Sequence, residues 1–398
     1  MRGWTTYKLC EVANLSTGFP FDGHKYAKTG LRVVRGDNVT IGELRWNTDK
    51  DKRWNEPFAR AEEFSLREGD IVIGMDGSRV GRNRAQIQLE DLPLLLAQRV
   101  ACVRHNDKTL QKFLYYQIFS KRFETYIKSV HTGTSIPHVS LKQIGDFSLQ
   151  VPDLPTQRRI AGILGLLDDK IELNRRINAN LEAQAQALFR SWFVDFEPFR
   201  DGPFVDSELG KIPQGWKVGT LSEIANITMG QSPKGSSYNE KGNGIIFYQG
   251  RAEFGYRFPS IRLYTTEPAR IAEINSVLLS VRAPVGDINI AKDKCCIGRG
   301  LAAIKSPKGY NSFILYLLQS LKPMLEQYNG EGTVFGCINR KEIEGLPVII
   351  PNESVISEFE IIAGKIDAEI KTLTTEQETL SALRDTLLPK LLSGEINV

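Results

Sequence analysis

The chain has 398 residues, of which 41% are hydrophobic and 25% are charged, and its formal net charge is +4. These values are ordinary for a soluble protein, and the length suffices for two or three domains with real cores. No apolar run approaches the roughly 20 residues that a membrane helix needs, and no targeting segment opens the chain, so we expect a cytoplasmic protein without membrane spans.

The five cysteines and four histidines lack the spacing of a metal or disulfide site. No CxxC pair occurs, and Cys295 and Cys296 are adjacent, which is a poor geometry for bridging each other. We therefore expect free thiols in a reducing compartment and no bound metal.

Residues 1–155 are expected to form a first globular domain. Short β-branched runs such as DIVIG (70–74) and RVACV (99–103) predict strands, and residues 113–130 predict amphipathic helix. This mixture indicates an α+β domain whose sheet is mixed or mostly antiparallel.

Residues 156–197 contain one long helix, predicted from Thr156 to Phe193. No Gly or Pro interrupts it after Gly165, and at 1.5 Å per residue it would be about 55 Å long. Its apolar residues recur at helical spacing, namely Ile160, Leu164, Leu167, Ile171, Leu181, Ala185, Leu188 and Trp192. A helix of this length needs a partner along its apolar stripe.

Residues 198–352 are expected to form a linker and a second globular domain, since residues 194–215 are rich in Pro, Gly and acidic residues. The second domain repeats the first: WTTYKLCEVA from Trp4 matches WKVGTLSEIA from Trp216, and LAQRVACV (96–103) matches CIGRGLAAI (296–304).

Residues 353–398 supply the missing partner helix, predicted from Glu358 to Leu392. Its stripe consists of Phe359, Ile362, Ile366, Ile370, Leu373, Leu380, Leu387 and Leu391, and most of these lie 199 positions after a stripe residue of the first helix. The chain therefore carries an internal two-fold repeat. We expect two similar globular α/β domains joined by two long antiparallel helices that form a coiled coil.

Positive charge collects in the globular parts. Residues 1–155 hold 23 Lys and Arg against 18 Asp and Glu, and residues 198–352 hold 18 against 14, whereas residues 353–398 hold 4 against 9. This distribution suits globular parts that face phosphate and helices that face protein.

The helix LPTQRRIAGILGLLDDKIELNRRINANLEAQAQALFRSWFVDFEPF, the ending LRDTLLPKLLSGEI and the duplicated plan together resemble the specificity (S) subunits of type I restriction–modification systems. The resemblance implies two target-recognition domains that each read one half of a split, asymmetric double-stranded DNA target. It also implies helices that set the spacer and dock two methyltransferase (M) subunits, which bind S-adenosylmethionine, with motor-nuclease (R) subunits in the full complex. The chain itself would catalyse nothing and bind no cofactor.

Candidate DNA contacts are the polar loops that Gly marks, because Gly lets the backbone approach phosphate and Arg, Asn and Gln can read base edges. In the first domain they are Arg35, Asp37, Asn38, Ser78, Arg79, Arg82, Arg84, Thr132, Thr134 and Ser135. In the second they are Gln231, Ser232, Lys234, Ser236, Ser237, Tyr238, Gln249, Arg251 and Thr333. Arg99 and Arg299 align in the repeat, but their strand-like surroundings allow a structural role equally well.

Six apolar residues widen the helix faces beyond the stripe, namely Ile163, Ile177, Phe189, Phe193, Leu383 and Leu388. They could bury against a methyltransferase helix or against the chain's own domains, and helical spacing does not separate these outcomes.

The sequence contains no convincing motif of a methyltransferase, a nucleotide-binding enzyme or a nuclease. It contains neither the Asn/Asp-Pro-Pro-aromatic string of adenine methyltransferases nor a complete phosphate-binding loop, since Ser236 stands where that loop needs lysine. A formal nuclease match, Asp153 with Asp168-Asp169-Lys170, places its second part inside the long helix rather than on a strand. The alternative function is a duplicated coiled-coil scaffold that joins two protein partners without reading DNA.

Overall fold

The computed structural model describes residues 3–47, 50–58, 60–133, 136–330 and 336–398. It divides into two compact units. Unit 1 comprises Met1–Glu172 with Glu378–Val398, and unit 2 comprises Leu173–Gln377. Each unit contains one globular domain together with part of both long helices.

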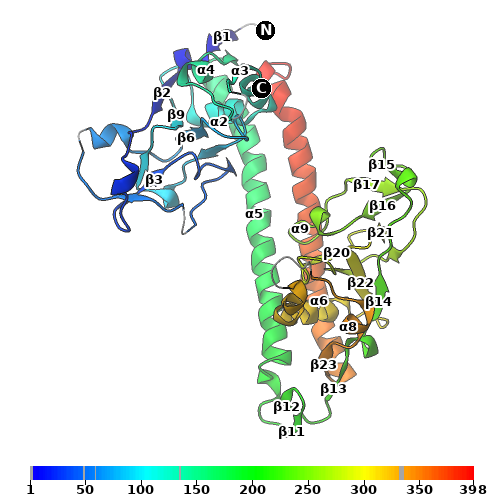
Figure 1. Cartoon of the computed structure of the whole chain (residues 1–398). Coiled ribbons are helices and arrows are strands. Elements are labelled where there is room, and N and C mark those ends of the chain that lie inside the picture. The colour runs from blue at the N-terminus through cyan, green and yellow to red at the C-terminus, as the bar shows by residue number, and fades with distance from the viewer. Residues whose placement is uncertain (1–2, 48–49, 59, 134–135, 331–335) are drawn as a thin grey trace. The chain divides into compact units, whose positions relative to one another are not determined.

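The two long helices are α5 (Leu154–Phe193, 40 residues) and α9 (Glu353–Ser393, 41 residues), drawn in green and orange to red in Figure 1. Both predicted helices are confirmed, and their observed N-terminal ends lie two and five residues earlier than expected. The Asp153 carboxylate accepts the Thr156 backbone N–H at 2.9 Å, which satisfies one of the free donors at the start of α5. Gly394, with φ +75°, ends α9 in the left-handed conformation that glycine favours.

The helices run antiparallel within each unit. In unit 1, Arg384 of α9 donates to Asp168 of α5 at 2.9 Å, and the apolar residues Ile160 and Leu164 share a core with Leu391. In unit 2, Asn174 donates to Glu376 at 2.7 Å and Asn178 to Thr374 at 3.1 Å. Nine residues of the predicted stripes pack in the two cores: Ile160, Leu164, Leu387 and Leu391 in unit 1, and Ala185, Leu188, Trp192, Phe359 and Ile366 in unit 2.

One residue of the predicted stripe is placed wrongly. Ile362 is 42% exposed, and its neighbour Ala363 is fully buried in its place. A helix advances 100° per residue, so a stripe read from spacing alone can be one position out where small residues allow the close approach.

In the described residues, the globular domain of unit 1 contains three sheets and four α-helices (Figure 1). The largest sheet has the order β2 (Ala13–Thr17), β9 (Val100–His105), β6 (Ile71–Gly74), β7 (Arg84–Gln86) and β4 (Ile41–Gly42). The others are β5 (Arg53–Trp54), β3 (Leu31–Val34) and β8 (Leu94–Leu96), and the antiparallel pair β1 (Thr5–Lys8) and β10 (Ser148–Val151). Helices α2 (Gln111–Phe119), α3 (Lys121–Val130) and α4 (Leu141–Gly145) follow, after the short α1 (Leu9–Val12).

The globular domain of unit 2 repeats this plan. One sheet has the order β14 (Asn226–Met229), β22 (Leu301–Lys305), β19 (Val277–Ser280) and β20 (Ile288–Ile290). A second has the order β15 (Tyr238–Asn239), β17 (Leu263–Thr265), β16 (Ile245–Tyr248), β21 (Cys295–Ile297) and β18 (Ile271–Ala272). The antiparallel pair β13 (Lys217–Thr220) and β23 (Pro347–Ile350) corresponds to the pair β1 and β10 of unit 1. Helices α2 to α4 correspond to α6 (Asn311–Ser320), α7 (Lys322–Glu326) and α8 (Arg340–Glu344).

The expected linker, residues 194–215, holds a hairpin of its own, formed by β11 (Phe204–Ser207) and β12 (Gly210–Pro213). Its Ile212 is buried in the same core as Phe189 of α5. This part of the chain is therefore packed structure rather than only a connection.

Two equivalent glycines show that the repeat extends to backbone packing. A Cβ atom added at Gly18 would lie 2.0 Å from the Leu96 carbonyl oxygen, and one added at Gly230 would lie 2.1 Å from the Gly298 carbonyl oxygen. Each glycine directly follows a strand, β2 or β14, at a close approach of two backbone segments where no side chain fits, which explains why the sequence match keeps glycine at both positions.

Phe189 and Phe193 are core residues of unit 2, so their predicted role in partner docking is corrected. Phe189 is 3% exposed, and its ring lies 5.8 Å from that of Phe313 and 5.7 Å from that of Phe359. These rings pack inside the chain's own domain, because the C-terminal end of α5 contacts α6 and the start of α9.

We expect Phe189→Ala to lower the free energy of unfolding by about 3–5 kcal/mol, because it leaves a cavity in this aromatic core. Leu166→Ala, on the same helix but 72% exposed, should change it by less than about 0.5 kcal/mol. Thermal denaturation of the purified variants followed by circular dichroism compares the two. Equal melting temperatures would contradict the assignment of Phe189 to the core.

Candidate nucleic-acid interface and docking surfaces

Unit 1 contains a groove of about 630 Å³ with a basic and aromatic lining. The segment after β3, the turn after β6 and the turn between β8 and β9 meet there. The groove contains four arginines, three aromatic rings and several short polar side chains, including Arg35, Arg45, Arg79, Arg99, Phe19, Phe21, Tyr26, Ser78, Gln98, Asp37 and Asp76. Cationic side chains beside stacking surfaces suit the phosphates and bases of a nucleic acid.

Carboxylates hold the cations of this groove in place. Arg35 donates to Asp37 at 3.0 Å and Lys50 donates to the same carboxylate at 3.1 Å, and these bonds, that of Lys50 above all, lower the pKa of Asp37. Arg99 donates to Asp76 at 3.2 Å, and Asp76 also contacts the His138 ring. A phosphate can replace such an exposed carboxylate as the partner of an arginine without moving its backbone.

The structure brings together four of the residues predicted in the first domain, namely Arg35, Asp37, Ser78 and Arg79, all of which line the groove. Thr132 and Arg82 are exposed outside the groove lining, and Arg82 lies 3.9 Å from Glu124 of α3. Thr134 and Ser135 lie outside the described residues.

Asn38 and Arg84 are buried, so their predicted roles as DNA contacts are corrected. The Asn38 side chain accepts the Arg35 backbone N–H at 3.0 Å and donates to the carbonyls of Arg45 and Lys50, which shapes the loop from inside. Arg84 donates to the carbonyl oxygens of Gly81 and Phe119, and burial lowers its pKa to about 10. Both side chains shape the fold rather than face a ligand.

Arg45, Gln98 and Arg99 were missing from the predicted contacts, yet they line the groove. Arg99 lies on the turn directly before β9, and Arg299 on the equivalent exposed turn directly before β22. The alignment of these two arginines in the repeat was the signal that could have identified them as candidates.

In unit 2, two predicted loops lie beside the turn that carries Arg299. The Gln231 backbone N–H donates to the Ile297 carbonyl at 3.0 Å, and the Gly298 N–H donates to the Tyr248 carbonyl at 2.8 Å. The Arg299 N–H donates to the Ser232 hydroxyl at 3.4 Å. These bonds bring Gln231, Ser232 and Gln249 beside Arg299, while Lys234 and Ser236 are exposed on the first of these loops.

Other residues predicted in unit 2 have different surroundings. Ser237 is buried and bonds Thr265 at 2.7 Å, so its predicted DNA contact is corrected. The Tyr238 hydroxyl donates to the Pro233 carbonyl at 3.0 Å, which holds its own loop. Arg251 pairs with Asp287, and Thr333 lies outside the described residues.

Three of the predicted docking residues stay uncovered by the chain. Ile163 and Ile177 of α5 are each 36% exposed, and Leu383 of α9 is 45% exposed. Leu388 packs partly against the core of unit 1. Leu166 and Leu173 are also exposed on α5, and Ile361 and Ile362 on α9, so both helices present apolar side chains beyond the seam.

The formal nuclease match has structural roles instead. Asp153 caps α5, and Asp168 accepts hydrogen bonds from Tyr116 and Arg384. Across the described ranges no three His, Cys, Asp or Glu side chains gather as a metal site. The same ranges contain no helix long and apolar enough to span a membrane.

Comparison with known proteins agrees with the duplicated plan. The family model described as "Type I restriction modification DNA specificity domain" matches residues 1–183 and 213–383. The chain is similar to the MjaX specificity subunit, assigned to a type I restriction enzyme of Methanocaldococcus jannaschii, with 35% identity over 390 residues that cover 94% of this chain and 88% of the relative. It is 25% identical over 471 residues to the HindI specificity subunit of Haemophilus influenzae, with both chains covered in full. The fold matches that of a type I S subunit from M. genitalium with a TM-score of 0.63 at 18% identity, covering 98% and 96% of the two chains.

If the unit 1 groove contacts phosphate, Arg99→Ala should weaken binding to a labelled duplex and reduce the slope of log affinity against log salt by about 0.9. Arg200→Ala is a matched control, because both side chains are similarly exposed, at 64% and 65%, and both pair with a carboxylate at 3.2 Å. Fluorescence anisotropy across a salt series measures both variants. Equal slopes in the two variants would contradict contact at Arg99.

Proposed function

The chain belongs to the family of type I restriction–modification DNA specificity subunits, and from this premise we propose how its two units read DNA and bind their partners. It is the non-catalytic sequence-recognition subunit of a methyltransferase and endonuclease complex. The observation that carries this function is the duplicated specificity domain, matched over both halves of the chain. Family membership also sets aside the alternative of a scaffold without sequence recognition.

Each unit reads one half of a split target. The loops that line the unit 1 groove, together with the two loops and the Arg299 turn of unit 2, supply Arg, Gln and Ser side chains for phosphates and base edges. The two sets differ in sequence, so the two half-sites differ and the target is asymmetric. The excess of positive charge in both globular parts supports contact with DNA.

The long helices set the distance between the half-sites. A helix of 40 residues is about 60 Å long at 1.5 Å per residue, whereas one duplex turn is about 34 Å. Helices longer than one duplex turn allow two readers to contact separate half-sites, with base pairs between them that neither reader contacts. Helix length is therefore the variable that determines spacer length.

As a specificity subunit, the chain associates with DNA, methyltransferase (M) subunits and motor-nuclease (R) subunits. We assign two M subunits to one chain, because one pair of exposed apolar residues is related by the repeat. Ile163 and Ile362 lie 199 positions apart, near the start of α5 and of α9, and both are exposed. Two equivalent exposed apolar residues can bind two copies of the same partner. Ile177 and Leu383 are further exposed candidates for docking. S-adenosylmethionine binds to the M subunits.

The chain works in the cytoplasm, where the DNA of the cell lies. Its five cysteines are all free thiols, as a reducing compartment requires.

Removal of this gene from its source cell should abolish adenine methylation at one split, asymmetric motif and leave other methylation unchanged. Reintroduction of the gene should restore that motif. Genome-wide sequencing that detects modified adenine measures both states and identifies the two half-sites. A methylation pattern identical with and without the gene, in a cell whose methyltransferase gene is expressed, would refute the proposed function.

Insertion of four residues into α5 between Glu172 and Asn180 should lengthen the spacer by one or two base pairs and keep both half-sites. Four residues add about 6 Å and slightly more than one helical turn, so the apolar stripe stays close to the same face. The methylated motif of the variant gives the new spacer directly. A motif with the original spacer would disprove the assignment of spacing to helix length.

A further inference from the structure

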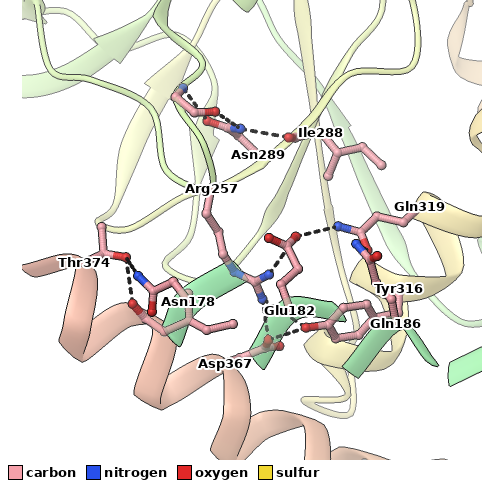
Figure 2. A network of polar contacts seen from close by, with 12 residues as sticks. Asn178, Glu182, Gln186, Arg257, Ile288, Asn289, Tyr316, Gln319, Asp367 and Thr374 are labelled. Carbon is pink, nitrogen blue, oxygen red and sulfur yellow. Dashed lines mark hydrogen bonds and ion pairs between the residues drawn. The ribbon is translucent and has the colours of Figure 1, made fainter. Parts of the chain in front are cut away.

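A buried arginine in unit 2 connects a loop with candidate DNA contacts to both long helices. Arg257 lies between β16 and β17 and is 4% exposed. Its guanidinium donates to Glu182 of α5 at 3.2 Å, to Asp367 of α9 and to the Tyr316 hydroxyl of α6 at 3.4 Å (Figure 2). One side chain of the recognition domain thus joins three helices.

The partners of Arg257 are themselves held in place. The Tyr316 hydroxyl donates to Asp367 at 2.7 Å, and the Gln319 amide donates to Glu182 at 3.3 Å. Burial opposes the charged form of Arg257, but the carboxylates of Asp367 and Glu182 raise its pKa above the ordinary value. The arginine therefore stays charged and fixed in direction within this network (Figure 2).

The loop that carries Arg257, residues 250–262, starts next to Gln249 and contains Arg251, both candidate DNA contacts. Its middle is fastened to β20: the Gly255 N–H donates to the Asn289 side chain at 3.0 Å, and the Ile290 N–H donates to the Arg257 carbonyl at 2.9 Å. The backbone and side chain of Arg257 thus anchor the loop on the sheet and on the helices at once.

Unit 1 contains the same pair of an aspartate and a tyrosine but a different cation. The Tyr116 hydroxyl donates to Asp168 at 2.7 Å, as Tyr316 does to Asp367, and the two aspartates lie 199 positions apart. The cation beside Asp168 is Arg384 of α9, at 2.9 Å. Helix packing around the aspartate therefore requires a cation, but it does not require one from a recognition loop.

A buried ion pair is weak support for a role in stability, because desolvation offsets much of the attraction between the charges and apolar replacements are often as stable. Its particular effect is to fix one arrangement of the groups that it joins. We propose that Arg257 is a positioning residue that holds the 250–262 loop in one conformation and so makes the reading of the second half-site strict. This inference rests on the proposed function.

The mechanism is a restriction of loop motion. A loop fixed on two helices cannot shift to pair with an incorrect base, so a mismatch leaves polar groups unsatisfied and is rejected. A loop released from the helices can adapt, and discrimination falls at the half-site that unit 2 reads.

The test is the triple variant Glu182→Gln, Arg257→Met and Asp367→Asn, which removes the three charges together and leaves no unpaired ion. The gene is replaced in the source cell, and genome-wide adenine methylation is measured. We expect the original motif and spacer to remain methylated, while methylation at sites with one mismatch rises on the order of tenfold in one half-site only. Unchanged discrimination, or equal loss in both half-sites, would overturn the proposal.

A matched control is the double variant Asp168→Asn and Arg384→Met, which removes the corresponding ion pair of unit 1 without freeing a recognition loop. It should keep wild-type discrimination in both half-sites. If the triple variant does not accumulate as a folded chain, the single variant Arg257→Lys tests the proposal instead. Lysine keeps the charge but lacks the planar guanidinium that bridges both carboxylates. Relaxed discrimination in one half-site supports the proposal, and wild-type discrimination overturns it.

The wild-type profile separates this inference from the function on which it rests. If the wild-type gene produces no split motif, the proposed function fails whatever the variants do. If the wild-type motif appears and the variants keep full discrimination, only the role of Arg257 fails.

Discussion

The structure depends on the burial of two helices that are too long to bury themselves. An amphipathic helix of about 40 residues exposes an apolar stripe along its whole length, and it is stable only when other elements cover that stripe. Here each helix covers part of the other, and a globular domain covers a further part in each unit. The seam also contains the buried amides Asn174 and Asn178, whose bonds to Glu376 and Thr374 exist in only one register. Apolar burial thus holds the helices together, and a few polar pairs determine their alignment.

Much of this arrangement could be predicted from sequence, because helical periodicity and an internal repeat are properties of the chain itself. The limits have physical causes. Spacing gives the face on which a residue lies but not the neighbour that covers it, so Phe189 and Phe193 were expected at a partner surface and Ile362 in the seam. Polarity likewise does not tell whether a side chain faces outward. Asn38, Arg84 and Ser237 bond within the chain, and Arg99 emerges from a strand-like run as an exposed turn residue.

The two halves agree where helices pack and differ where loops face outward. The hydrogen-bonded pairs Tyr116–Asp168 and Tyr316–Asp367 recur, as do Gly18 and Gly230 at a close approach of backbones. By contrast, unit 1 has a groove wall of packed rings, in which Phe19 lies 5.0 Å from Phe21, while unit 2 reaches its helices through Arg257. Duplication supplies a common scaffold, and divergence of the loops supplies two different readers.

The division of the chain into two units has a consequence for how recombination can exchange its parts. Unit 2 is one continuous segment, Leu173–Gln377, and it begins and ends within the two long helices rather than at loops. The buried pairs Asn174–Glu376 and Asn178–Thr374 lie inside that segment, and Asp168–Arg384 lies wholly outside it. Genetic exchange that enters within α5 and leaves within α9 therefore transfers a complete unit with its core and its seam contacts intact. Such a cassette can bring a new half-site to an existing complex in a single recombination event.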